Sequence, residues 1–213
     1  MAPDAVAAPE AGVSDPAVGL PRTLLIACGA LARETLAAIE ASGLGGLAIT
    51  CLPAKLHNRP ALIPEAVRAK IREHRPGFER ILVLYGDCGT GGALDRVLAE
   101  EGVERIGGPH CYAFYAGEPL FAALSEAEPG TFYLTDFLVR QFDTLVIEGL
   151  GIDRHPELLP LYFGNYRRLL YLAQTDDPAL DAQAEAAARR LGLAFERRFT
   201  GLGELGRFVR SAA

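Results

Sequence analysis

The sequence has no tryptophan, one methionine, and only four cysteines and four histidines among its 213 residues. It also lacks an excess of basic side chains. There are 27 acidic and 21 basic residues, and the formal charge of −6 argues against nucleic acid or an anionic membrane as a partner. No apolar run approaches the roughly 20 residues that span a bilayer. The remaining composition, 50% hydrophobic and 23% charged, is that of an ordinary globular protein.

The first 21 residues differ from the rest of the chain. They are rich in alanine and proline, have no periodic apolar face, and contain no lysine or arginine before Arg22. These features are not those of a secretory signal or a transit peptide. We therefore predict a disordered tail over residues 1–21 and a single α/β domain over residues 22–213. A cytoplasmic location follows, in which the cysteines are reduced.

From Arg22 onward, short apolar runs alternate with amphipathic stretches. The apolar runs predict strands over residues 23–27, 47–52, 81–85, 103–107, 132–134, 168–173 and 194–199. The amphipathic stretches predict helices over residues 33–42, 60–74, 89–101 and 118–127, after Thr135 or Asp136, within 157–166, and over 177–191 and 202–209. In the first helix, Leu36, Ala37 and Ile39 are the expected buried face.

Strands separated by helices of this length are typical of βαβ units. The sequence therefore predicts an α/β fold, Rossmann-like, with an open and largely parallel sheet that carries helices on both faces. Proline and glycine are dense near residues 128–130 and 149–156. These two segments leave a pair of small lobes as an alternative to one continuous domain.

The four cysteines lie at or just beyond the ends of the first four predicted strands, one for each strand. Because the carboxyl ends of parallel strands meet at one edge, where ligands of open α/β sheets bind, distant cysteines can converge there. We expect Cys28, Cys88 and Cys111 to share one site. Cys51 lies inside an apolar strand, where cysteine commonly fills core space.

Two of these cysteines precede a glycine at a predicted tight turn that enters a helix. They form the pairs Cys28-Gly29 and Cys88-Gly89. The free N–H groups and the dipole of a helix N-terminus stabilise a thiolate. We therefore expect both thiols to ionise readily, in the form that binds metal or attacks an electrophile.

Histidines accompany the cysteines. His110 immediately precedes Cys111, and His57 lies on the loop after Cys51. Thiolates and imidazoles together suit zinc or an iron–sulfur cluster, but there is no CxxC pair, and no spacing identifies the metal. The predicted metal ligands are Cys28, Cys88, Cys111 and His110. His57 is an alternative fourth ligand or a partner that orients a ligand.

Residues 86–92 form a glycine-rich segment between a strand and a helix. The segment matches neither the dinucleotide fingerprint nor the P-loop pattern, so a tight turn that lets a ligand or cluster approach the backbone is favoured over nucleotide binding. Asp87 is an acid–base candidate, with a turn cap as the alternative. Glu34 is a second acid–base candidate, with a surface carboxylate as the alternative. The predicted cofactor-binding residues are Gly29, Gly89, Thr90 and Gly91.

Several motifs taken together resemble one family. They are CGAL at residues 28–31 followed by Glu34, LHNRP at 56–60, LYGDCGTG at 84–91, HC at 110–111 and PGTFYLT at 129–135. Over roughly residues 22–210 the chain resembles the uncharacterised family called domain of unknown function 1638. The family pattern matches Cys28, Cys88 and Cys111 and lacks a cysteine at Cys51. Members are often encoded near corrinoid-dependent methyltransferases for methylated amines, so the resemblance implies a place in one-carbon metabolism.

Three functional hypotheses follow. The first is a cysteine-liganded zinc or iron–sulfur protein in methyl-group metabolism, either an enzyme or an accessory protein with a corrinoid protein or a methyltransferase as partner and an indirect link to corrinoid. The second is a metal-free thiol enzyme, in which Asp87, Glu34 or His110 assists a cysteine that acts as nucleophile or base. The third is a non-catalytic module that binds a small ligand or a partner. A brown anaerobic preparation would favour a cluster.

Overall fold

Residues 23–212, which the computed structural model describes, contain seven strands in two separate parallel sheets. The chain divides into two units. Residues 23–111 and 205–212 form the first unit, and Tyr112–Glu204 form the second. The predicted α/β, Rossmann-like, open parallel architecture is confirmed, in its two-lobed form. The tail predicted for residues 1–21 lies outside the described residues.

The sheet of the first unit has the strand order β2-β1-β3-β4, and every pair in it is parallel. The strands are β1 (Thr23–Cys28), β2 (Leu47–Leu52), β3 (Arg80–Leu84) and β4 (Glu104–Arg105). The two central strands, β1 and β3, are almost continuously apolar and buried, as expected for strands covered on both faces. The chain proceeds from β1 to β2 on one side of it, and then from β2 through a helix to β3 on the other side of β1. The switch point, where such sheets bind ligands, therefore lies between β1 and β3.

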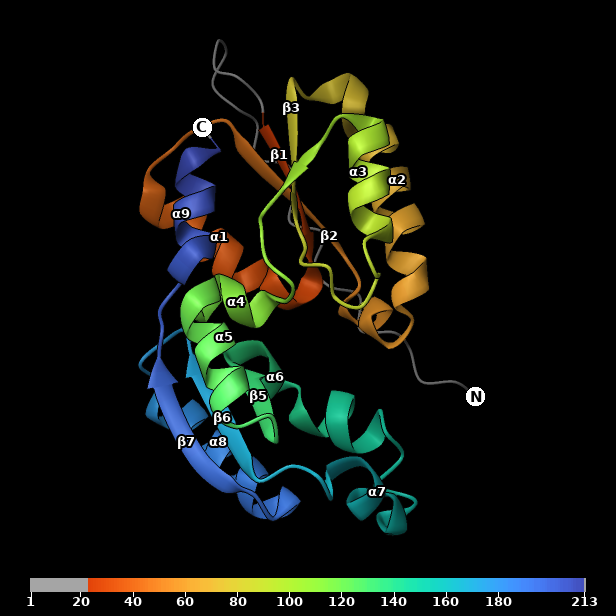
Figure 1. Ribbon diagram of the computed structural model, residues 1–213. Helices are drawn as coiled ribbons and strands as arrows, with labels where there is room; N and C mark the ends of the chain where they lie inside the picture. The colour runs from red at the N-terminus through yellow and green to blue at the C-terminus, as the bar shows by residue number, and fades with distance from the viewer. Residues whose placement is uncertain (1–22, 213) are drawn as a thin grey trace. The chain divides into compact units, whose positions relative to one another are not determined.

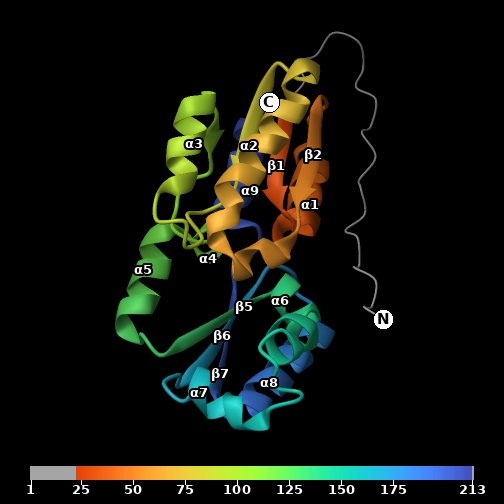
Figure 2. The ribbon, with the colours of Figure 1, turned by 90° about the vertical axis from the view of Figure 1, so that its right-hand side faces the viewer.

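Helices cover both faces of this sheet. They are α1 (Ala32–Ser42), α2 (Ile63–His74), α3 (Ala93–Glu101) and α9 (Gly203–Ser211), of which α9 belongs to the first unit from Leu205 onward. The helices α2 and α3 pack side by side on one face, and α1 and α9 lie on the other (Figures 1 and 2). None of the helices within residues 23–212 combines the length and the apolar character needed to cross a membrane.

The buried face predicted for α1 is wrong. Leu36 is 44% exposed and Ala37 is also exposed, whereas Glu34, Thr35 and Ala38 are buried. Small alanines occur on several sides of this helix, so its apolar periodicity does not define a single face. Packing against β1 and β2 sets the rotation of the helix instead.

The sheet of the second unit has the order β5-β6-β7 and is also parallel. Its strands are β5 (Thr131–Thr135), β6 (Arg168–Ala173) and β7 (Ala194–Phe199). On one face, α5 (Glu118–Ala127) packs through Leu124 on Tyr133, Leu170 and Leu172. The other face carries the main apolar cluster, to which α6 (Asp136–Arg140), the π-helical segment Phe142–Glu148, α7 (Leu159–Phe163) and α8 (Pro178–Leu191) contribute.

Three differences from the predicted elements concern the loops after the strands of the first unit. The helix α2 begins only after a 3-10 turn over Pro60–Leu62. The helix α3 begins at Ala93, four residues after the predicted start at residue 89. A further helix, α4 (Cys111–Ala116), is not predicted because its aromatic and alanine residues follow a run of glycine and proline. All three differences lengthen or reshape the loops at the carboxyl edge of the sheet.

Candidate functional site

All four cysteines of the chain lie at the carboxyl edge of the sheet in the first unit. Cys28 is the last residue of β1, and Cys51 is the penultimate residue of β2. Cys88 follows β3, and Cys111 opens α4 after β4. The sulfur of Cys28 is close enough to those of Cys88 and Cys51 to interact with both electrostatically. The backbone amide of Cys111 interacts with the sulfur of Cys88.

His57 approaches this group from the 3-10 turn Ala54–Asn58, which follows β2. Its Nδ1 lies 3.0 Å from the carbonyl oxygen of Ala54 and 3.8 Å from Sγ of Cys28. Because a carbonyl oxygen only accepts hydrogen bonds, this contact assigns the proton to Nδ1 and leaves a lone pair on Nε2. A backbone carbonyl that fixes the histidine tautomer in this way is typical of metal-ligating histidines.

His110 is the second histidine near this group. Its Nδ1 is 3.4 Å from Sγ of Cys111, and its ring centroid is 6.5 Å from that of His57. Burial, together with the nearby His57, lowers the pKa of His110 to about 4. His110 is therefore neutral at physiological pH, which is the form that ligates metals.

Two glycines let these segments close on the sheet edge. A Cβ atom at Gly29 would lie 3.1 Å from the carbonyl oxygen of Leu52, at the end of β2. A Cβ atom at Gly86 would lie 3.0 Å from both Cα and N of His110. The absence of a side chain at these positions thus brings the backbone after β2, and the backbone that carries His110, against the central strands. Gly29, predicted to bind a cofactor, has this packing role in the structure.

The thiols are protonated, contrary to prediction. Burial raises the pKa of Cys28 to about 12, although interactions with the amide of Ala30 and with Tyr85 lower it. Burial likewise raises the pKa of Cys88 to about 11. Cys28 caps only a three-residue 3-10 turn, with a 3.4 Å contact from the Ala30 amide, and Cys88 lies five residues before α3 begins at Ala93. At Cys28, the rise in pKa caused by desolvation therefore outweighs the lowering by the short turn. At Cys88, no helix begins close enough to the sulfur to lower its pKa in this way.

The loop that carries Cys88 is built by Asp87. One oxygen of Asp87 accepts from the Thr90 hydroxyl at 2.7 Å and the Gly92 amide at 2.8 Å, and the other accepts from the Gly91 amide at 3.2 Å. These hydrogen bonds hold the pKa of Asp87 below its usual range, and the one from the Gly92 amide lowers it most. A carboxylate so engaged fits the turn-capping alternative better than the acid–base role. It also occupies two amides that a phosphate would need.

Cys88 has a backbone φ of 49°, and it is the only non-glycine residue with positive φ between residues 23 and 212. Such a conformation is strained for a residue with a Cβ atom and persists where the surrounding structure enforces it. Gly89, with φ of 84°, continues the left-handed loop. The strained backbone is thus that of Cys88, whose thiol lies near the switch point, just after β3.

For two further candidate residues, the observed burial differs from the expected burial. Cys51 is only partly buried, so it does not fill the core as expected, although burial still raises the pKa of its thiol to about 11. Glu34, in the first turn of α1, is 6% exposed, which excludes the surface-carboxylate alternative. The acid–base role of Glu34 is not tested by its burial and stays a prediction.

Tyr85, which follows β3, was not predicted as part of the site. Its ring stacks on His57 with centroids 6.1 Å apart and planes 13° apart. Its hydroxyl interacts with the thiol of Cys28, and burial followed by that thiol raises the pKa of Tyr85 above its usual range. The sequence feature that could have identified Tyr85 is its place at the end of the most apolar strand, directly before the motif that contains Cys88.

Within residues 23–212, no three cysteine, histidine, aspartate or glutamate side chains are already arranged around a common metal position. The closest sulfur–nitrogen pairs are Cys28 with His57 at 3.8 Å and Cys111 with His110 at 3.4 Å. For comparison, two ligands of one tetrahedral zinc, at about 2.3 Å for sulfur and about 2.1 Å for nitrogen, lie about 3.6 Å apart. The pair of Cys111 with His110 therefore has a suitable spacing. His57 would bind through Nε2 and not through the Nδ1 that faces Cys28, so bringing three donors to one point requires side-chain rotation.

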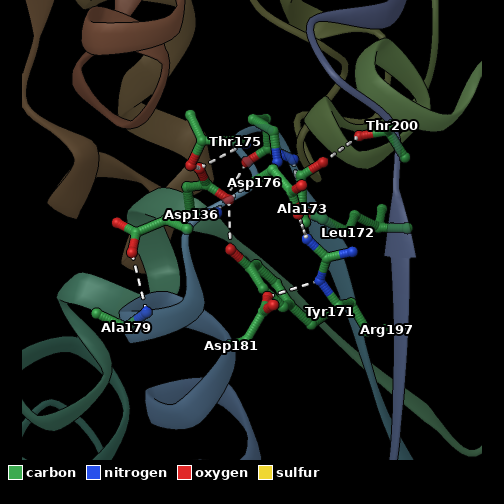
Figure 3. A network of polar contacts seen from close by, with 12 residues as sticks. Asp136, Tyr171, Leu172, Ala173, Thr175, Asp176, Ala179, Asp181, Arg197 and Thr200 are labelled. Carbon is green, nitrogen blue, oxygen red and sulfur yellow. Dashed lines mark hydrogen bonds and ion pairs between the residues drawn. The ribbon is translucent and has the colours of Figure 1, made fainter.

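The second unit has a different polar centre, which the sequence indicated only as a helix cap (Figure 3). Asp136 is fully buried and accepts from the Tyr171 hydroxyl at 2.6 Å and the Gln174 amide at 2.9 Å. Its second oxygen accepts from the amide and the hydroxyl of Thr175, at 3.0 and 2.6 Å. The cap of α6 is Thr135. Asp136 ties together the carboxyl ends of β5 and β6, with both oxygens occupied.

No curated protein matches the sequence. Residues 51–209 match the family described as "Protein of unknown function (DUF1638)". The match includes Cys51, Cys88 and Cys111 together with both site histidines, and it begins after Cys28, so it is shorter than the resemblance over residues 22–210. Because it covers well over half of the sequence, the chain belongs to this family of unknown function.

Proposed function

We propose that the carboxyl edge of the first unit is a soft-metal centre, with Cys28, Cys88 and Cys111 as sulfur ligands and His110 or His57 as nitrogen ligand. The observation that carries the proposal is the gathering of all four cysteines and two of the four histidines at one sheet edge. These residues come from four different segments of the chain, so local sequence does not account for their proximity. Thiolate and imidazole donors together suit zinc or an iron–sulfur cluster.

The state of the imidazoles supports this proposal. His57 donates Nδ1–H to a backbone carbonyl, and burial keeps His110 neutral. Both rings can therefore offer a lone pair. Neutral histidine with its second nitrogen held by a backbone acceptor is the usual form of a metal ligand.

The thiols must lose their protons for metal to bind. Because burial raises the pKa of Cys28 and Cys88, both thiols hold their protons in the metal-free protein, and a dication must displace these protons as it binds. Metal binding should therefore release protons into an unbuffered solution. The sulfurs must also rotate toward a common point, since no three donors share one in the described residues.

The test is anaerobic purification of the full chain, followed by elemental analysis and an absorption spectrum. A brown protein with stoichiometric iron and sulfide would identify a cluster, and a colourless protein with stoichiometric zinc would identify a zinc site. Preparations that contain no metal and take up none on reconstitution with zinc, or with iron and sulfide, would refute the proposal.

A metal-free thiol enzyme is the second candidate, favoured by one observation. The sulfur of Cys28 lies 3.8 Å from Nδ1 of His57, and cysteine–imidazole pairs are used in nucleophilic catalysis. For Nδ1 to act as the base, His57 would have to give up its hydrogen bond to Ala54 and carry its proton on Nε2 instead. An alkylating reagent distinguishes the two candidates. A catalytic thiol should react in a chelator-treated protein and in the untreated protein alike, whereas a ligand thiol should be protected until the metal is removed.

We further propose that this centre acts in the cytoplasm, in one-carbon metabolism, as an enzyme or as an accessory to a corrinoid-dependent methyltransferase system. The support is the family resemblance, together with a site whose thiols are in the reduced form. A zinc with an open position would activate a thiol acceptor or a water, whereas a cluster would transfer electrons.

Binding to a purified corrinoid protein, measured by calorimetry with loaded and metal-free protein, tests the partnership. A non-catalytic module would bind without any dependence on metal.

A further inference from the structure

The hydroxyl group of Tyr85 is buried, and burying a hydroxyl group without a hydrogen-bond partner costs stability. The side chain is 1% exposed, and no nitrogen or oxygen among the described residues is a hydrogen-bond partner of its hydroxyl. A buried polar group left in this state costs about 1–3 kcal/mol, and phenylalanine would fill the same space without that penalty. The hydroxyl therefore needs an explanation other than stability.

The neighbours of Tyr85 provide that explanation. Its ring stacks on the imidazole of His57, with the planes 13° apart. Its hydroxyl lies near the sulfur of Cys28, on the neighbouring strand, without a hydrogen bond of ordinary geometry. One side chain, anchored at the end of a central strand, thus contacts both a sulfur and an imidazole of the proposed ligand set.

We propose that Tyr85 is a positioning residue, whose hydroxyl donates a hydrogen bond to the Cys28 sulfur once that sulfur is a metal-bound thiolate and whose ring fixes the plane of His57. This inference rests on the proposed metal site. A neutral thiol is a weak acceptor, whereas a thiolate is a strong one. The hydroxyl is therefore poorly satisfied in the metal-free protein and well satisfied in the loaded one.

The test compares Tyr85→Phe with Tyr171→Phe. Tyr171 is equally buried, but its hydroxyl donates to Asp136 at 2.6 Å, in the second unit. Each variant removes one buried hydroxyl and keeps the ring. The readouts are zinc affinity by chelator competition, the sulfur-to-cobalt charge-transfer band after cobalt substitution, and the unfolding midpoint of the metal-free protein.

Tyr85→Phe should weaken zinc affinity about 10- to 100-fold and shift the cobalt band, as expected for loss of a group that supports a ligand. Its metal-free unfolding midpoint should be unchanged or higher. Tyr171→Phe should lower the unfolding midpoint and leave zinc affinity unchanged.

Two results would overturn the inference. If the wild type binds zinc and Tyr85→Phe binds it equally well, Tyr85 has no positioning role, while the metal site stands. If the wild type binds neither zinc nor cobalt and assembles no cluster, the metal site and the role of Tyr85 are refuted together.

Discussion

The two parallel sheets of this protein end in different ways at their carboxyl edges. In the second unit, Asp136 receives four hydrogen bonds from three residues that follow or belong to β6, and both of its oxygens are occupied. In the first unit, the edge carries thiols and imidazoles, and the sulfur–nitrogen distances are 3.8 Å for Cys28 with His57 and 3.4 Å for Cys111 with His110. Similar strand architecture thus produces one edge whose buried carboxylate is fully hydrogen-bonded and one edge that is lined by thiols and imidazoles.

The strain in the backbone follows the same division. Cys88 in the first unit has φ of 49°, and no other non-glycine residue within the described part of the chain has positive φ. Strain at a ligand-type residue is commonly retained for function, because stability alone would favour glycine there. If the proposed function is correct, the edge around Asp136 serves stability and the edge around Cys88 serves binding, and four predictions test this division.

The largest effect is expected for Cys88→Ser. Replacing the sulfur should reduce bound metal by more than about tenfold, since a hydroxyl is a poor ligand for a soft metal. Cys51→Ser is the matched control. Cys51 is only partly buried, so this variant should retain its metal and lose less than about 1 kcal/mol of stability. Metal stoichiometry and urea unfolding midpoints are measured for both. If Cys51→Ser loses the metal and Cys88→Ser retains it, the assigned roles are reversed.

Asp136→Asn should destabilise the protein by about 2–4 kcal/mol, because an amide nitrogen would then face donors that need an acceptor in a fully buried place. The control is Asp143→Asn, which removes an exposed ion pair with Arg190 and should cost less than about 1 kcal/mol. Urea titration measures both variants. Metal content should be unaffected by either change. Loss of metal in folded Asp136→Asn would contradict the proposed separation of roles.

Gly86→Ala should weaken metal binding about tenfold, because it moves a ligand-bearing backbone by a few tenths of an ångström. The new Cβ atom would lie 3.0 Å from Cα and N of His110, where only the backbone can give way. Gly107→Ala is the control, since its Cβ atom would have no neighbour within 4 Å. Chelator competition measures the affinity of each variant. Equal affinities would show that the position of His110 does not matter to the site.

The smallest effect concerns the ion pair of Asp95 with Arg105, at 2.6 Å, which supports the segment after β4. Arg105 also donates to the carbonyl oxygens of Ile106 and Gly108, and its hydrogen bond to Asp95 lowers the pKa of Asp95. Because Asp95 is half exposed, Asp95→Asn should cost less than about 1 kcal/mol at neutral pH.

This cost should depend on pH. A lowered carboxyl pKa stabilises the folded state above the unfolded pKa of about 3.9, and the contribution disappears as pH falls through the folded pKa. The difference in unfolding midpoint between the wild type and Asp95→Asn should therefore be constant between about pH 5 and 7 and should narrow below about pH 4. A difference that grows with acidity would show that another group dominates.

The extent of sequence-based prediction can be judged from particular elements. The strands β2, β6 and β7 begin and end at the predicted residues. The apolar runs of β2 and β6 are bounded by polar, glycine or proline residues nearby in the chain, and β7 has apolar residues at both ends, between Gly192 and Gly201. The sequence also predicts one cysteine at or just after the end of each of the first four strands. In contrast, the buried face of α1 was wrong, since alanine on several sides leaves its rotation to the sheet beneath it.

The sequence by itself determined the parallel α/β architecture and the type of donor atoms at the ends of the first four strands, because both depend on local patterns. Only the tertiary structure decided that the strands divide between two sheets and that His57 lies beside Cys28. It also decided that Tyr85 contacts both residues and that the thiols of Cys28 and Cys88 are protonated. The physical reason is that proximity and desolvation arise from segments distant in the chain, and desolvation sets the charge of a buried group more strongly than its neighbours in sequence do.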